Sequence, residues 1–180
     1  MKLSTRELVL AGLFAAIISI LSQFTIPLGT IPLTLQTFAV GFAVTLLGKK
    51  TGTIAVLIYL LLGLIGLPVF AGGNAGFAVL FGPTGGFLIG FIFSAFTTGW
   101  ILEKTHLNFF NAILANLVGT FITLLFGAAW LKVSGSMTWT GAFAAGLIPF
   151  ILPSIIKAFA AGYLAVLIGR RLSYTRMLYQ

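Results

Sequence analysis

The chain places one basic side chain inside an apolar segment near its carboxyl end. Lys157 stands in IPFILPSIIKAFAAGYLAVLIG, a run with no other charged residue. A cation in such a run is costly inside a membrane, and it usually marks a substrate or ion site. Ser154 precedes it by three residues, so a helix would bring both side chains to one face. Two interpretations are open: the Lys157 amine reaches the membrane surface along its apolar stem, or it binds a ligand.

A glycine-rich stretch supplies the second group of candidate residues. Residues 67–86 read LPVFAGGNAGFAVLFGPTGG, with six glycines, two prolines and no charge. Such backbone does not form a regular helix. At membrane depth it is tolerated only where it is buried in protein or lines a cavity. The Asn74 amide can both donate and accept there, and Phe70, Phe77 and Phe81 could form apolar walls. Together with Lys157, these groups suit a small, partly apolar molecule with a carboxylate or urea-like group.

The composition predicts the elements that position these residues. The 180 residues are 59% hydrophobic and 7% charged, whereas soluble domains are about 25% charged. We therefore expect an all-α integral membrane protein, with residues 1–180 as a single domain. At about 20 residues per crossing, six transmembrane helices nearly fill the chain. They are expected at residues 6–25, 36–47, 52–66, 84–102, 108–131 and 140–171, and the first is read as a retained helix, because no small-x-small cleavage site lies near its end.

The basic residues predict the orientation. With both termini in the cytoplasm, eight of them fall on the cytoplasmic side: Lys2, Arg6, Lys49, Lys50, Lys104, Arg170, Arg171 and Arg176. Lys132 alone falls outside, and this asymmetry follows the positive-inside rule. Lys157 lies thirteen residues before Arg170, which is about 20 Å along a helix. The glycine-rich stretch is then at the outer face, and its pocket is expected to open outward.

Several chemistries have no residues to support them. The chain has no cysteine, and its two acids, Glu7 and Glu103, fall near the ends of predicted helices. General acid–base catalysis by paired carboxylates inside the membrane is therefore excluded. A lone histidine, His106, does not make a metal site. The string GKKT has Ala43 and Lys50 where a phosphate-binding loop needs glycine and Ser or Thr. The scattered basic residues form no patch for nucleic acid.

Three sequence strings resemble the BioY family, the biotin-specific substrate-binding (S) components of energy-coupling factor (ECF) transporters. They are IPLTLQT at residues 31–37, GLIGLPVFAGGNAG at 63–76 and FGPTGGFLIGF at 81–91. The resemblance covers nearly the whole chain. It implies the six-helix S-component fold, high-affinity biotin binding and uptake at the cell membrane, and no enzymatic activity of its own. It also implies assembly with a transmembrane coupling protein and two ATPase subunits, and toppling of the S component within the membrane lipid.

The resemblance also assigns roles to residues. The asparagine after the double glycine corresponds to Asn74, and the lysine of the last helix corresponds to Lys157; both belong to the biotin pocket. An alanine-spaced AxxxA motif on the first helix docks the coupling protein, and it matches Ala11 and Ala15. We expect the full pocket to contain Thr34, Gln36, Phe70, Gly73, Asn74, Thr84, Ser154 and Lys157.

One position departs from the family pattern and leaves the ligand open. The family typically has Asp three residues before the lysine, whereas this chain has Ser154. A ligand carboxylate, on biotin, on lipoate or on another small carboxylated cofactor, could supply the missing charge, or Ser154 could hydrogen-bond a ureido group. Two further alternatives are a membrane hydrolase with a Ser154–Lys157 dyad, which would lack a G-x-S-x-G context, and a channel or self-sufficient permease.

Overall fold

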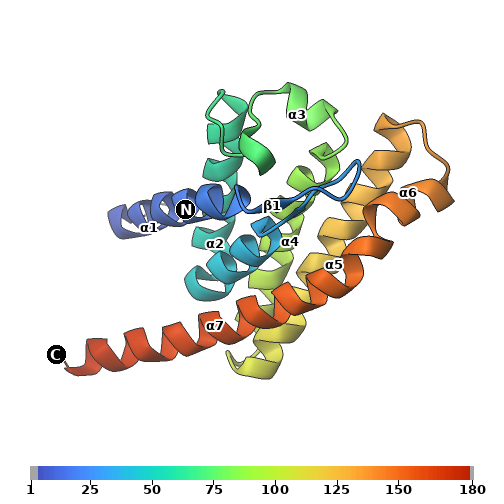
Figure 1. Ribbon diagram of the computed structural model, residues 1–180. Helices are drawn as coiled ribbons and strands as arrows, with labels where there is room; N and C mark the ends of the chain where they lie inside the picture. The colour runs from blue at the N-terminus through green and yellow to red at the C-terminus, as the bar shows by residue number, and fades with distance from the viewer. Residues whose placement is uncertain (1–3, 179–180) are drawn as a thin grey trace.

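Long apolar helices build the molecule, and short elements connect them at one end (Figure 1). The computed structural model describes residues 4–178, with side chains as far as residue 171. Lys2 and the side chain of Arg176 therefore lie outside the described part. The long helices are α1 (Thr5–Ser22), α2 (Gln36–Leu64), α4 (Gly85–Lys104), α5 (Phe109–Ser134) and α7 (Ile151–Leu178). The short elements are β1 (Thr25–Ile26), β2 (Leu33–Thr34), η1 (Ala71–Gly73), α3 (Ala78–Phe81), α6 (Trp139–Gly146) and η2 (Ile148–Phe150).

Helix α2 consists of two rods that meet at Gly48. Gly48 has φ 81° and ψ 173°, a conformation outside the helical region that glycine adopts readily. The chain folds back sharply there, since a Cβ on Gly52 would lie 2.7 Å from the Cα of Val44. In a straight helix these two residues would be about 12 Å apart. The predicted second and third helices are therefore the two rods of α2, and with this bend the five long helices of the described chain give the six predicted segments.

The predicted last helix is interrupted, which corrects the sequence-based expectation of one helix over residues 140–171. Helix α6 ends at Gly146, a short 3-10 turn follows, and α7 begins at Ile151. Pro149 lies within the 3-10 turn, and proline lacks the amide hydrogen that a continuing helix needs. Pro153 lies in the first turn of α7, where that amide would have no helical acceptor. The interruption lets α7 cross the bundle at its own angle (Figure 1).

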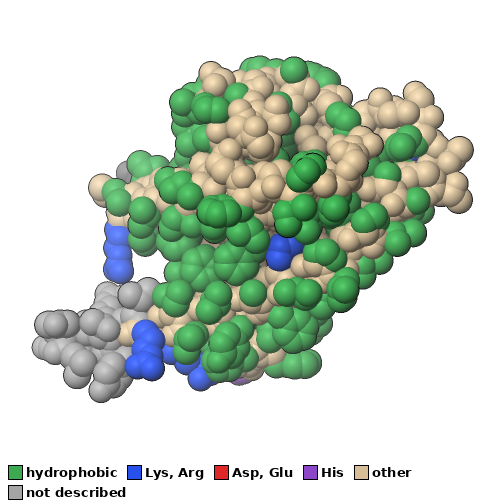
Figure 2. Space-filling view, viewed as in Figure 1, with side chains coloured by type: hydrophobic (Ala, Val, Ile, Leu, Met, Phe, Trp, Pro, Cys, Tyr) green, Lys and Arg blue, Asp and Glu red, His purple; other side chains and the backbone are tan. Residues whose placement is uncertain are grey.

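Charged residues gather at the end of the bundle that contains the α2 bend. Lys49 binds Glu103 at the end of α4 at 2.5 Å, and Lys50 binds Glu7 at the start of α1 at 3.1 Å. Arg170 of α7 lies over the ring of Phe109, 4.5 Å from its centroid. Figure 2 shows this basic edge at the lower left and a largely hydrophobic surface beside it. The structure thus brings the predicted cytoplasmic charges to one end, and the cytoplasmic assignment of that end stays a prediction.

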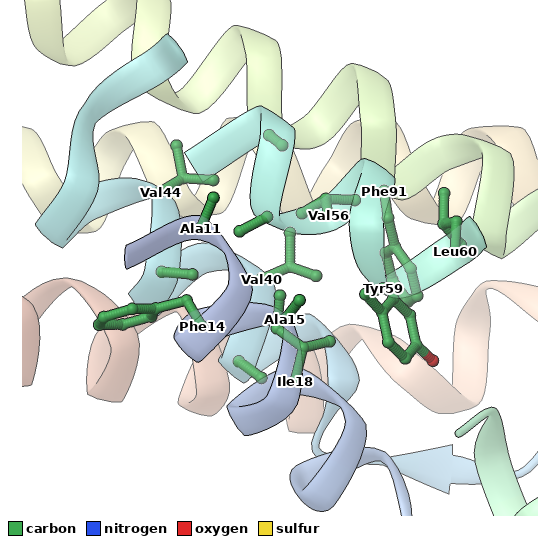
Figure 3. Packing of buried hydrophobic residues seen from close by; sticks show 14 of the residues in the cluster. Ala11, Phe14, Ala15, Ile18, Val40, Val44, Val56, Tyr59, Leu60 and Phe91 are labelled. Atoms are coloured by element: carbon green, nitrogen blue, oxygen red, sulfur yellow. The ribbon is translucent and has the colours of Figure 1, made fainter. Parts of the chain in front are cut away.

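Helix α1 packs on α2 through its small residues, which corrects the docking role expected for Ala11 and Ala15. Both alanines are fully buried and lie beside Val40 and Val44 of α2 (Figure 3). They therefore hold two helices of this chain together and leave no surface for a partner. The exposed small residues of α1 are Gly12 and Ala16, one position further along.

Candidate ligand-binding site

A cavity of about 320 Å³ lies at the loop end of the bundle, opposite the basic edge. Residues from the β1–β2 hairpin, the glycine-rich stretch and helices α2, α4, α5 and α7 contribute to it. Its walls are formed by Thr30, Ile31, Pro32, Thr34, Gln36, Thr37, Phe70, Ala71, Asn74, Val79, Gly82, Pro83, Thr84, Phe87, Leu88, Phe91, Leu124, Phe150, Ser154 and Lys157. The lining is largely apolar with a few polar groups, as is usual for small-molecule sites.

The hairpin side of the cavity is fixed by a buried amide network. Strands β1 and β2 pair antiparallel, and β2 leads directly into α2. The Thr34 hydroxyl donates to Gln36 Oε1 at 2.8 Å, and Gln36 Nε2 donates to the hydroxyl oxygen of Tyr59 at 2.6 Å. Gln36 is 6% exposed and Tyr59 is fully buried. These groups bind each other, so they hold the hairpin in place and leave little capacity for a ligand.

The glycine-rich stretch folds back on itself and is fastened to the end of α1. Gly72 and Gly73 both have positive φ, 68° and 77°, which turns the chain between Phe70 and Asn74. The side-chain Nε2 of Gln23 donates to the carbonyl oxygens of Pro68 (3.3 Å) and Phe70 (3.4 Å). This irregular backbone is therefore held by protein groups, as expected at membrane depth.

Phe70 is the anchor of that stretch. It is 1% exposed and meets Tyr59 edge-on, with ring centroids 5.7 Å apart. Gly63 makes room for it, because a Cβ there would lie 2.1 Å from Phe70 Cζ. Asn74 follows at the cavity wall, and its amide nitrogen donates to the Ala71 carbonyl at 2.7 Å. The amide oxygen of Asn74 has no partner among the described residues and can accept a hydrogen bond from a ligand.

The GPTGG segment forms the opposite rim at the start of α4. The Trp130 indole donates to the carbonyl of Gly82 at 2.9 Å, and this bond fixes the turn that carries Thr84. Gly86 lets α4 meet α5 closely, because a Cβ there would lie 2.1 Å from the Cβ of Trp130.

Lys157 points inward from α7. Its amine donates to the Thr34 carbonyl at 3.0 Å, which links α7 to the hairpin. The amine lines the cavity and also a neighbouring, mostly apolar hollow between the hairpin and α7, which includes Phe24, Ile26 and Ile156. The geometry favours a ligand or buried polar contact over an amine extended to the membrane surface. It gives no support to a hydrolase dyad, since the Lys157 amine donates to Thr34 and no hydrogen bond joins it to Ser154 among the described residues.

The structure brings most of the predicted pocket residues together. Around one cavity lie Thr34, Gln36, Phe70, Asn74, Thr84, Ser154 and Lys157. Gly73 does not line it; its left-handed backbone turns the chain, and its open side lies toward Gln23. Phe77 and Phe81 are 63% and 73% exposed and do not form the expected walls.

Sequence reasoning missed the aromatic side chains that do line the cavity. They are Phe87 and Phe91 of α4 and Phe150 of η2. Phe87 and Phe91 are four residues apart and therefore share one face of α4, directly after the GPTGG turn. That spacing after a turn already assigned to the pocket was a usable signal.

Comparisons with known proteins agree over nearly the full length. The BioY family model matches residues 1–174. The chain is 43% identical to the biotin transporter BioY2 of Lactococcus lactis subsp. cremoris (strain MG1363), with 94% of this chain and 93% of the relative covered. It is 40% identical to the biotin transporter BioY of Thermotoga maritima, with 89% and 94% covered.

A solved structure also matches. The crystal structure of the S component for biotin from an ECF-type ABC transporter is 34% identical, with a TM-score of 0.83, and the match covers 96% of this chain and 95% of that one. Family model, relatives and fold agree, and the chain therefore belongs to the BioY family.

Proposed function

We propose that this multi-pass membrane protein is the biotin-binding S component of an ECF transporter and takes part in ATP-driven biotin uptake. The observation that carries the proposal is one small cavity with a single amine, Lys157, in its wall. Relatives named as biotin transporters and a biotin S component of similar fold support the ligand assignment.

The cavity has the size and polarity that biotin needs. Its volume of about 320 Å³ lies at the small end of the range for ligand pockets. Phe87, Phe91 and Phe150 offer apolar surface for the fused rings and the aliphatic tail. Asn74 and Lys157 offer an acceptor and a donor for the polar ends. No acidic residue lines the cavity, so an anionic ligand meets no repulsion from carboxylates.

Lipoate remains the alternative ligand, because it shares the carboxylate tail and the size of biotin. The two differ in the ring, since biotin carries a ureido group and lipoate a disulfide. The polar groups of the cavity favour the ureido head, because a site built to hydrogen-bond discriminates strongly against an analogue that lacks the partner atoms.

The first prediction concerns equilibrium binding. Purified protein in detergent is expected to bind labelled biotin saturably, one molecule per chain, with a dissociation constant below micromolar. Lipoate is expected to compete at least about 100-fold more weakly, because it cannot pair with the polar head site. Titration calorimetry with biotin, and displacement by lipoate, measure both values. Equal competition by lipoate would reassign the ligand, and no saturable biotin binding would refute the function.

We further propose that the protein assembles with a transmembrane coupling protein and two ATPase subunits. The chain has no phosphate-binding loop of its own, so ATP hydrolysis needs another subunit. Helix α1 offers a surface for the coupling protein. Gly12 and Ala16 are exposed and four residues apart, a spacing that permits close helix packing in membranes. Leu8, Val9 and Leu13 around them are more than half exposed.

The second prediction tests this surface. Replacing both Gly12 and Ala16 by leucine is expected to abolish co-purification with the coupling protein, because the added side chains hold the helices apart. Biotin affinity should not change, since neither residue lines the cavity. Ala144→Leu is the matched control: Ala144 is also exposed, and it lies on α6, on the opposite side of the molecule (Figure 1). Normal assembly of the double variant would rule out this face.

The proposal also includes an orientation of the protein in the membrane. The basic edge at the α2 bend would face the cytoplasm, in line with the positive-inside rule. The cavity lies at the other end, beneath the hairpin and the glycine-rich stretch, and would then open to the outside.

A further inference from the structure

Two threonine hydroxyls in the described part of the chain are buried without a hydrogen-bond partner. They belong to Thr37 and Thr53, both on α2. Buried polar groups are paired in the great majority of cases, and an unpaired one destabilises the fold. Each such group therefore needs an explanation.

Their positions differ in one decisive respect. Thr37 lies in the first turn of α2 and lines the cavity, whereas Thr53 lies on the second rod of α2 and does not. The polar neighbours of Thr37 are already engaged: the Thr34 hydroxyl and the Gln36 amide bind each other and Tyr59. Thr37 thus retains an unused hydroxyl on the hairpin side of the cavity.

A change of side-chain rotamer alone would redirect the Thr37 hydroxyl, because the residue already lines the cavity wall. The Thr37 Oγ1 is out of contact with solvent, although the residue itself lines the wall. Rotation by about 120° about the Cα–Cβ bond moves the hydroxyl to another staggered position, and threonine in helices uses two such rotamers. A ligand that brings an acceptor atom would give the hydroxyl the partner that it lacks.

We propose that Thr37 is a specificity-determining residue that donates a hydrogen bond to the ureido carbonyl oxygen of the ligand head. This inference rests on the proposed function. It makes Thr37 selective for a ring with a carbonyl oxygen over a ring of similar size without one. Since the hydroxyl has no partner among the described residues, removing it should not destabilise the fold and should cost only the ligand contact.

The test is a thermodynamic cycle that combines a substitution at Thr37 with a replacement of the ureido oxygen of the ligand. The ligands are biotin and 2-iminobiotin, in which a protonated imino group replaces the carbonyl oxygen at neutral pH. Thr37→Val keeps the shape of the side chain and removes the hydroxyl. It is expected to raise the dissociation constant for biotin about tenfold and to leave that for 2-iminobiotin unchanged. The thermal unfolding midpoint of the ligand-free protein should stay the same or rise.

Two further variants complete the experiment. Thr53→Val removes the other unpaired hydroxyl and should change neither affinity, while Thr37→Ser keeps a hydroxyl and should retain most of the biotin affinity. The inference is overturned if Thr37→Val binds biotin as the wild type does, or if both dissociation constants rise equally, which would indicate a structural role. Absence of biotin binding by the wild type would instead refute the proposed function, and the inference with it.

Discussion

Replacing Lys157 by methionine is expected to weaken biotin binding about 100-fold. The amine is the one cationic group of the cavity, and a hydrogen bond to a charged group contributes about 1.5–3 kcal/mol. Methionine keeps the length and apolar stem of the side chain, so the loss isolates the charge and its donors. Titration calorimetry on purified protein measures the change. Biotinamide, which lacks the carboxylate, shows which end of the ligand meets the amine: it should bind the variant and the wild type equally if Lys157 binds the carboxylate.

Lys132→Met is the matched control for this experiment. Lys132 lies in the last turn of α5 over the ring of Trp139, and it does not line the cavity. Its replacement removes a cation from the same end of the bundle and should leave biotin affinity unchanged. Because Lys157 also donates to the Thr34 carbonyl, thermal unfolding of each variant separates a lost ligand contact from a loosened hairpin. Unchanged affinity in a folded Lys157→Met protein would contradict the assignment of the pocket.

Replacing Gly99 by alanine is expected to lower the free energy of unfolding by about 1–3 kcal/mol, the usual effect of overpacking. Alanine normally stabilises a helix relative to glycine. At Gly99 the new Cβ would lie 2.3 Å from the Cα of Lys49 and 2.6 Å from its Cβ. The contact is with backbone, so no flexible side chain can move aside, and α4 must separate from the bend of α2.

Gly12→Ala is expected to change the free energy of unfolding in the opposite direction in the same assay. No atom lies within 4 Å of a Cβ at Gly12, so alanine should stabilise α1 by up to about 1 kcal/mol. Thermal unfolding of the ligand-free protein in one detergent compares the two. We expect the midpoint of Gly99→Ala to fall by about 5 °C and that of Gly12→Ala to rise slightly. An unchanged or higher midpoint for Gly99→Ala would mean that α4 and the bend of α2 are far enough apart to hold the added methyl group.

The sequence predicted those features that depend on local chemistry. Gly48 and the paired lysines after it marked the reversal within α2, because glycine favours positive φ and charges avoid the membrane interior. Asn74 and Lys157 were polar groups in apolar surroundings and were correctly expected at one cavity. The break at residues 147–150 was missed, although Pro149 marked it, because the apolar run continues without interruption on both sides.

The sequence did not reveal which side of each helix points to the protein interior and which points to the lipid. In a soluble helix the polar residues mark the outer side. Around α1 the lipid and the protein interior are both apolar, so nothing in the pattern distinguished Ala11 and Ala15 from Gly12 and Ala16. The same reason explains why Phe77 and Phe81 were expected in the walls and Phe87 and Phe150 were not. Only the packing of one helix on another decides these directions.

The single amine of the cavity has an electrical consequence for uptake. Lys49 and Lys50 are paired with Glu103 and Glu7 at the far edge, so no carboxylate side chain of the described residues offsets Lys157. With the amine protonated, the empty protein holds one uncompensated positive charge at membrane depth, and capture of a monoanion cancels it. A voltage of 100 mV does work of about 2.3 kcal/mol on one charge carried fully across. If uptake involves reorientation of the protein in the membrane, as the family resemblance implies, voltage is expected to act more on the empty form than on the form that holds a monoanion.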